Sequence, residues 1–250
     1  AELMSIQTAD GTEYLWQGNP AYWGDRAPNI FPYVARLTNG QYTYHGKTYH
    51  LPIHGFAPTA KFSLQDWEKT SVTFVLESNE AFYEMYPFRF RFHLRYYLEE
   101  NTLHVEMKVE NLDEKTMYFG LGGHPGFNVP LVSGKRFEDY RLRFAETCQP
   151  RHVGFNEACF VTGTYADFPL EGGQILSLRH EMFDNDAIVL DSMTRQVTLE
   201  CDGDDHAGFD ALAHAGAGNL FKNGLLDVLA LNVIAGKLLS RVEHLRQRYF

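Results

Sequence analysis

Apolar and polar residues alternate along the middle of the chain. From Phe88 to Leu98 an apolar side chain occupies every second position, with arginine, histidine or tyrosine between. After the polar residues 99–102 the alternation resumes and runs to Glu110. A period of two is typical of a β-strand with one buried face. The pattern therefore predicts two strands joined by a tight turn, a β-hairpin.

The charges of this hairpin support one register. If Leu98 pairs with Leu103, arginines of the first strand stand opposite glutamates of the second. These pairs are Arg95 with Glu106 and Arg91 with Glu110. Opposite charges at paired positions stabilise a sheet by about 0.2–1 kcal/mol per pair. Both faces of the hairpin thus favour the same alignment.

Short segments with strand composition recur up to about residue 210, separated by turn residues. They are residues 2–8, 12–16, 71–78, 116–122, 140–145, 174–180, 187–191 and 196–201. No repeat or low-complexity linker divides them. We therefore expect an all-β fold, with residues 1–210 forming one large antiparallel β-sandwich whose sheets cover one another's apolar faces.

The pattern changes after Asp210. Apolar residues then recur at spacings of three and four, at Val228, Leu231, Ala235, Leu238, Val242, Leu245 and Tyr249. This period predicts a helix, which Gly236 weakens by about 1 kcal/mol relative to alanine. Residues 211–250 are thus expected to form a helical tail. The stripe fits either packing on the sandwich or contact with a partner helix, so a homodimer is an open alternative.

Composition narrows the possible partners and location. The 250 residues are 44% hydrophobic and 14% aromatic, which suits a folded β-rich domain, and the net charge is −10. That charge repels nucleic acid and anionic lipid. The sequence has no long apolar run and no secretion signal at its start, so we expect no membrane contact. Three cysteines without metal-site spacing suit a reducing compartment, and we expect a cytoplasmic protein.

Two histidines stand in glycine-containing turns and are candidates for proton transfer. His124 lies in "LGGHPGF" and His54 in "IHGFA". Glycine permits sharp turns and proline stiffens the segment, so an imidazole there is presented with little freedom. Its ordinary pKa suits acid–base chemistry near neutral pH. A turn histidine that only bonds a backbone carbonyl remains the alternative for His124.

A metal site is the rival interpretation of these histidines. His45, His50 and His54 cluster, but their spacings match no compact zinc motif and no acidic ligand adjoins them. We therefore do not expect a metal site. The chain also lacks the GxSxG motif, the P-loop and the dinucleotide fingerprint. Glycoside hydrolysis needs two flanking carboxylates, whereas the candidates here are histidines.

Two further side chains are candidates for binding a polar ligand. Arg36 follows an aromatic loop that contains Tyr22, Trp23 and Phe31, and aromatic faces beside polar groups are typical of sugar clefts. Arg36 could equally form a surface ion pair. In "MFDNDAIVLDS", Asp184 suits a turn, and Asp186 could bind hydroxyl groups or belong to the same turn.

The motifs, taken in chain order, resemble a known family. "EYLWQGNPAYWGDRAPNIFPYVARL", "IHGFA", "YPF" and "GGHPGFN" are similar to the aldose 1-epimerase (galactose mutarotase-like) family, in its compact bacterial branch, over roughly residues 1–200. The resemblance implies an antiparallel β-supersandwich. It also implies a metal-free and cofactor-free isomerase that interconverts the α and β anomers of a hexose or related aldose, free or phosphorylated.

The resemblance also assigns roles to the candidate residues. The histidine of the "GGHP" motif, His124, protonates the ring oxygen of the sugar, and His54 of the "HGF" motif assists by hydrogen bonding. Arg36 contacts sugar hydroxyls, although Ala35 stands where the family commonly has glycine. Asp186 matches the substrate-binding aspartate of the family.

Other departures bear on activity. Pro58 stands where family members usually carry arginine, and the family's first strand has no match at the front of the sequence. The family's general base is a glutamate in a late "IEPW"-like segment, and nothing similar follows Asp210. Glu243 lies among basic neighbours on the expected helix and is a poor substitute. A non-catalytic carbohydrate-binding or regulatory module that has lost its base is therefore the alternative to an active isomerase.

Overall fold

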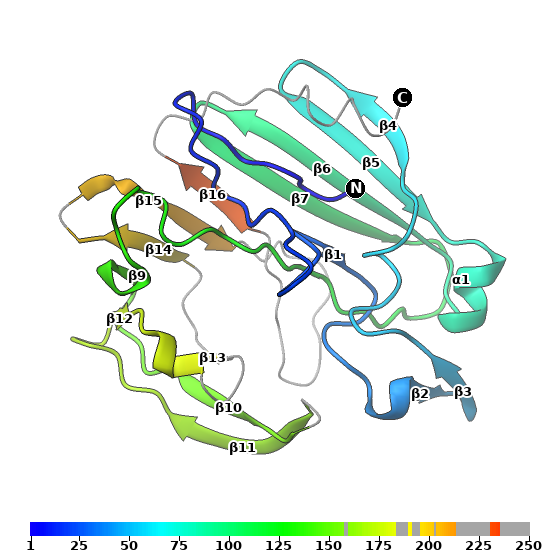
Figure 1. Cartoon of the computed structure of the whole chain (residues 1–250). Helices are drawn as coiled ribbons and strands as arrows, with labels where there is room; N and C mark the ends of the chain where they lie inside the picture. Colours follow the sequence, from blue (N-terminus) through cyan, green and yellow to red (C-terminus); the bar gives the residue numbers. More distant parts are fainter. Residues whose placement is uncertain (158–159, 184–189, 192–195, 203, 214–230, 236–250) are drawn as a thin grey trace.

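The structure is a computed structural model that describes residues 1–157, 160–183, 190–191, 196–202, 204–213 and 231–235. Its centre is an antiparallel nine-stranded sheet in the order β12-β9-β14-β15-β16-β7-β6-β5-β4 (Figure 1). The strands of this sheet are β4 (Ser63–Trp67), β5 (Ser71–Glu77), β6 (Phe90–Glu99), β7 (Thr102–Asn111), β9 (Tyr140–Phe144), β12 (Ile175–Ser177), β14 (Gln196–Cys201), β15 (Asp204–Ala213) and β16 (Leu231–Ala235).

Smaller elements accompany this sheet. They are β1 (Asn29–Ile30) with β8 (Gly122–Gly123), β2 (Gln41–Tyr44) with β3 (Lys47–His50), and β10 (Arg151–Phe155) with β11 (Val161–Asp167) and β13 (Leu190–Asp191). The helical elements are α1 (Glu80–Met85) and three short 3₁₀ turns at Thr38–Gly40, Phe137–Asp139 and His180–Phe183. The expected all-β antiparallel fold is thus confirmed.

The hairpin of β6 and β7 has the predicted register. Leu98 pairs with Leu103, and the two arginine–glutamate pairs lie opposite each other. A guanidinium nitrogen of Arg95 lies 3.3 Å from a carboxylate oxygen of Glu106, and one of Arg91 lies 3.3 Å from a carboxylate oxygen of Glu110. These ion pairs lie on the outer face of the sheet, which leaves the other face to the apolar residues.

The apolar face of the hairpin carries the core. Phe90, Phe92 and Leu94 have no exposed surface, and the layer formed by residues 1–62 packs against them. Phe31 is the centre of this packing, because its ring lies 4.9 Å from that of Phe90 and 5.3 Å from that of Phe92, centroid to centroid. In Figure 1 the N-terminal segment, drawn in blue, crosses β6 and β7. The buried side of the sheet is therefore covered by the segments that carry the candidate site.

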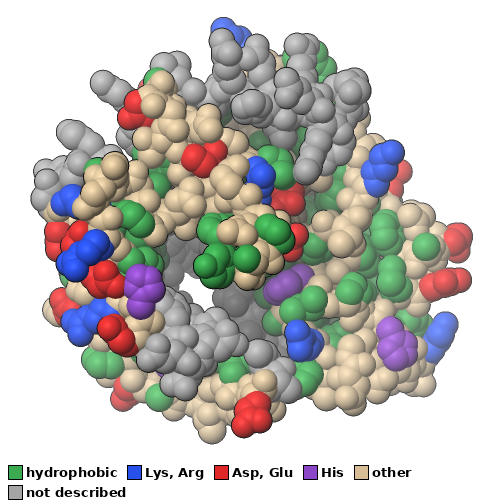
Figure 2. Space-filling model, viewed as in Figure 1, with side chains coloured by type: hydrophobic (Ala, Val, Ile, Leu, Met, Phe, Trp, Pro, Cys, Tyr) green, Lys and Arg blue, Asp and Glu red, His purple; other side chains and the backbone are tan. Residues whose placement is uncertain are grey.

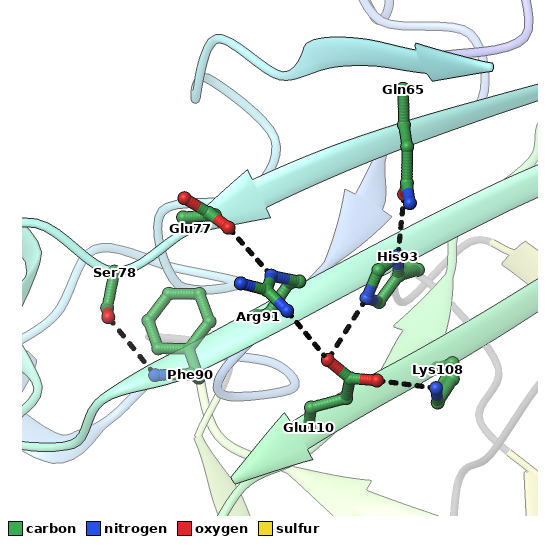
Figure 3. A network of polar contacts seen from close by, with 8 residues as sticks. All are labelled: Gln65, Glu77, Ser78, Phe90, Arg91, His93, Lys108 and Glu110. Carbon is green, nitrogen blue, oxygen red and sulfur yellow. Dashed lines mark hydrogen bonds and ion pairs between the residues drawn. The ribbon is translucent and has the colours of Figure 1, made fainter. Parts of the chain in front are cut away.

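Polar side chains interlock on the outer face (Figure 3). Glu110 of β7 accepts from Lys108, and its Oε2 lies 3.3 Å both from Arg91 Nη1 and from His93 Nε2. The Nδ1 atom of His93 lies 2.8 Å from Gln65 Oε1 of β4. Hydrogen bonds from Lys108 and His93 lower the pKa of Glu110 to about 2. Glu110 is thus the common partner of three basic side chains on this face.

The tail differs from the expected helix where the structure describes it. Residues Leu231–Ala235 form β16, which is inserted between β15 and β7 and pairs antiparallel with both. The sequence "LNVIA" contains the β-branched Val233 and Ile234, and ladder bonds on two sides favour a strand over an isolated helical turn. The predicted boundary near Asp210 stays a prediction, and residues 214–230 and 236–250 lie outside the described residues.

Candidate active site

His124 is held at the end of a two-residue strand. Gly122 and Gly123 form β8, which pairs antiparallel with β1. The backbone N–H of His124 donates to the carbonyl of Pro28 at 3.0 Å, and that of Gly126 to Arg26 at 2.8 Å. These bonds fix the turn from both sides, while the residue itself is exposed. An exposed imidazole on a fixed backbone can reach a ligand.

His54 is held by a reciprocal pair of hydrogen bonds with Ala35. Its backbone N–H donates to the carbonyl of Ala35 at 2.9 Å, and the N–H of Ala35 donates to its ring Nδ1 at 3.2 Å. His54 has a positive φ of 63°, and Gly55 follows at 72°. This left-handed pair of residues turns the chain sharply, which places the ring against the neighbouring segment.

The bond from Ala35 determines the tautomer of His54. Because Nδ1 accepts a hydrogen bond, the proton of the neutral ring resides on Nε2. Burial lowers the pKa of His54, and the nearby His124 lowers it further because two positive imidazoles repel each other. His54 is therefore a neutral hydrogen-bond donor through Nε2.

The structure brings the two predicted histidines together. Their ring centroids lie 5.4 Å apart with the ring planes at 67°. The indole of Trp23 lies on His124 as well, at 5.0 Å between centroids. Sequence reasoning placed Trp23 in an aromatic loop but missed this contact and the role of the Ala35 peptide, because both join segments far apart in the chain.

Of the two predicted substrate-binding residues, the structure describes Arg36 but not Asp186. Arg36 is exposed and directly follows Ala35, so its backbone adjoins the segment that holds His54. Asp186 lies outside the described residues. Among the described residues, no hydrogen bond or ion pair joins an Asp or Glu to either imidazole, and no group of three or more His, Cys, Asp or Glu is arranged to hold a metal ion.

An apolar cavity lies beneath the His124 turn. Its lining includes Ile6, Val105 and Met107, together with the buried Asn29 and Tyr96. The amide of Asn29 donates to the hydroxyl of Tyr96 at 3.0 Å, so these polar groups already bond each other. The cavity therefore offers a polar ligand little, and a polar ligand is better placed on the exposed side of His124.

The surface bears on the class of partner. Figure 2 shows Lys and Arg side chains scattered among Asp and Glu on the face in view, without a continuous basic area for a phosphate backbone. In the part of the chain that the structure describes, no helix is both long and apolar enough to span a bilayer.

The chain is similar to known proteins over most of its length. A family model described as aldose 1-epimerase matches residues 1–205. The LacX protein of Lactococcus lactis is 34% identical over 215 residues, which cover 79% of this chain and 69% of LacX.

Solved structures show the same fold. A galactose mutarotase related enzyme from Lactobacillus acidophilus has a TM-score of 0.74 at 30% identity, covering 95% of this chain and 81% of that one. A galactose mutarotase-like protein from Lactobacillus casei has a TM-score of 0.77 at 32% identity, covering 85% and 73%. The fold is thus the galactose mutarotase-like β-supersandwich, and the chain belongs to the aldose 1-epimerase family.

Proposed function

We propose that the protein interconverts the α and β anomers of an aldose, such as a free or phosphorylated hexose. The observation that carries the proposal is the contact between two imidazoles with different properties. His124 is exposed and fixed by its backbone, whereas His54 is held neutral with a defined tautomer. Such a pair supplies one proton donor for the reaction and one hydrogen-bond donor for the substrate.

The proposed reaction opens and recloses the sugar ring. His124, in its charged form, donates a proton to the ring oxygen while a base removes the proton from the hydroxyl group on C1. The electron pair of that O–H bond forms the C1 carbonyl as the bond between C1 and the ring oxygen breaks. The open aldehyde rotates about the C1–C2 bond, and the reverse steps close the ring on its other face. Both protons return, so the reaction needs no co-reactant.

His54 assists without exchanging a proton. Protonation of its Nδ1 would break the hydrogen bond from Ala35 and place a second positive charge 5.4 Å from His124. Its Nε2–H group instead donates to an oxygen of the sugar and orients the ring toward His124. We assign Arg36 and Asp186 to contacts with sugar hydroxyl groups.

The base is the open part of this mechanism, because the family's late glutamate has no counterpart in the sequence after Asp210. A protein that binds sugar without converting it is the competing function. A cytoplasmic location and a homodimer likewise stay predictions from the sequence.

The test is the anomerisation of freshly dissolved α-glucose and α-galactose, followed by polarimetry. We expect rates above those in buffer, and a loss of about 10²–10⁴-fold for His124→Asn. His54→Gln keeps an N–H donor at a similar position and retains more activity than His54→Leu. His104→Asn, on the outer face of β7, serves as the matched control and leaves the rate unchanged.

Two outcomes would contradict the proposal. Either the protein is no faster than buffer, or His124→Asn equals the parent protein. Saturable binding of a sugar in calorimetry, without any rate enhancement, would identify a binding module instead.

A further inference from the structure

The backbone of Trp23 is anchored at both ends of the residue. Its N–H group donates to the carbonyl of Asn19 at 2.9 Å, and its own carbonyl accepts from the indole Nε1 of Trp16 at 2.8 Å. The N–H group of Trp16 in turn donates to the carbonyl of Gly126 at 2.9 Å. The loop that carries Trp23 is thereby joined to the turn that carries His124.

The Trp23 ring occupies a space that exists only because residue 126 is glycine. A Cβ atom on Gly126 would lie 2.8 Å from Cζ3 of Trp23, closer than side chains pack, and 3.0 Å from the Cβ of Trp16, which is tighter than most contacts. The indole therefore lies close against the backbone of the "GGHPGF" turn. In this position the centroid of its ring lies 5.0 Å from that of the His124 imidazole, two residues before Gly126.

His124 consequently has a ring neighbour in each of two distant segments. His54 comes from the loop after β3, and Trp23 comes from the loop before β1. An exposed histidine otherwise turns freely about two side-chain bonds, and proton transfer requires a defined direction.

We propose that Trp23 is a positioning residue whose indole holds the imidazole of His124 in the orientation for proton donation to the sugar. This inference rests on the proposed function, since it assigns His124 as the acid. It makes Trp23 necessary for the rate of ring opening and largely dispensable for sugar affinity. If Trp23 instead stacked on the sugar, it would be necessary for sugar affinity and largely dispensable for the rate of ring opening.

The test compares Trp23→Leu with Trp23→Phe and with Trp67→Leu. Phenylalanine keeps an aromatic face toward His124, and Trp67 is an exposed tryptophan on edge strand β4 that supplies a matched control. We expect Trp23→Leu to lower kcat about 10- to 100-fold with KM within about twofold. Trp23→Phe should recover most of the rate, and Trp67→Leu should leave it unchanged. If Trp23→Leu loses its fold by circular dichroism, Trp23→Met fills more of the same space without an aromatic ring.

A second readout does not depend on activity. The ring current of Trp23 shifts the imidazole C–H resonances of His124, which are assigned by their disappearance in His124→Asn. We expect those resonances to move in Trp23→Leu and to stay in Trp67→Leu. If the parent protein converts no sugar, the proposed function fails, and this spectrum still decides whether the indole of Trp23 lies against the imidazole of His124, the contact on which the inference depends. Unchanged His124 resonances, or an increase in KM with kcat preserved, would overturn the inference.

Discussion

Phe31 joins the core to the candidate site, and its truncation should destabilise both. The side chain has no exposed surface, and its ring contacts five other rings. These belong to Phe56, Tyr86, Phe90, Phe92 and Phe119, with centroids 4.9–5.9 Å away. The carbonyl of Phe31 also accepts hydrogen bonds at 3.1 Å from the N–H groups of Phe56 and Ala57, beside the His54 turn.

The expected cost of Phe31→Ala follows from this packing. Replacing a buried phenylalanine by alanine costs about 3–5 kcal/mol, and the value is highest where the surroundings cannot collapse into the cavity. The two bonds to the Phe31 carbonyl hold its backbone in place, so we expect about 4–5 kcal/mol. That is a large fraction of the roughly 5–15 kcal/mol by which a folded domain is stable.

Urea unfolding followed by tryptophan fluorescence measures this cost. With a slope of about 3 kcal/mol per molar urea, the midpoint of Phe31→Ala should fall by more than about 1 M. Phe155→Ala is the matched control, because Phe155 is 39% exposed, and it should change stability by about 0.5 kcal/mol or less. A cost for Phe31→Ala below about 1.5 kcal/mol, or one equal to that of Phe155→Ala, would refute the reasoning.

Two further predictions concern the turn glycine and pH. A Cβ on Gly55 would lie 2.3 Å from the backbone oxygen of Phe31, so Gly55→Ala should lower both stability and anomerisation. Gly46→Ala, at a similar positive φ but with no atom within 4 Å, should cost only about 1–2 kcal/mol in urea unfolding; equal costs for the two variants would contradict the steric argument. The pKa of His54 is lowered in the fold, so its contribution is complete above the unfolded value of 6.5 and is lost as pH falls through the folded pKa. The pKa of Glu110 falls to about 2, so its contribution is complete above 4.5 and is lost toward pH 2. Urea midpoints between pH 2 and 8 should therefore decline in two steps. His54→Gln should remove the first step, and Glu110→Gln should reduce the second, to which the lowered pKa values of Glu138 and Glu200 also contribute. A parent-like profile in either variant would exclude that group as a cause.

The sequence predicted the elements that have strong alternation. The β6–β7 hairpin has both its strands and its register in the pattern, because apolar pairs and charge pairs point to one alignment. Where the alternation of apolar and polar residues is weaker, the predicted strands agree less well with the structure. Residues 2–8 and 12–16 form only isolated bridges. The less hydrophobic β10 and β11, which the pattern did not indicate, form an antiparallel pair with one shift of register. Helix α1 is six residues long, which is too short for a helical period.

The site shows the same division between local and distant information. His54 and His124 can be identified from the sequence because each lies in a glycine-containing motif, and the motifs follow one another in the same order as in the family. The tautomer of His54 depends on the peptide of Ala35, and the orientation of His124 on the ring of Trp23. No local sequence pattern predicts either contact, because both join residues that are far apart in the sequence and meet only in the folded chain.

The polar network of Figure 3 makes the outer face of the sheet unequally tolerant of change. Glu110 is shared by three groups, Arg91, His93 and Lys108, so the loss of any one leaves it two partners. Arg91 keeps a bond to Glu77 and His93 keeps its contact with Gln65. Loss of Glu110 would instead leave its basic neighbours facing one another without their common anion. Variation among homologous chains should therefore be frequent at each basic position and rare at the single carboxylate.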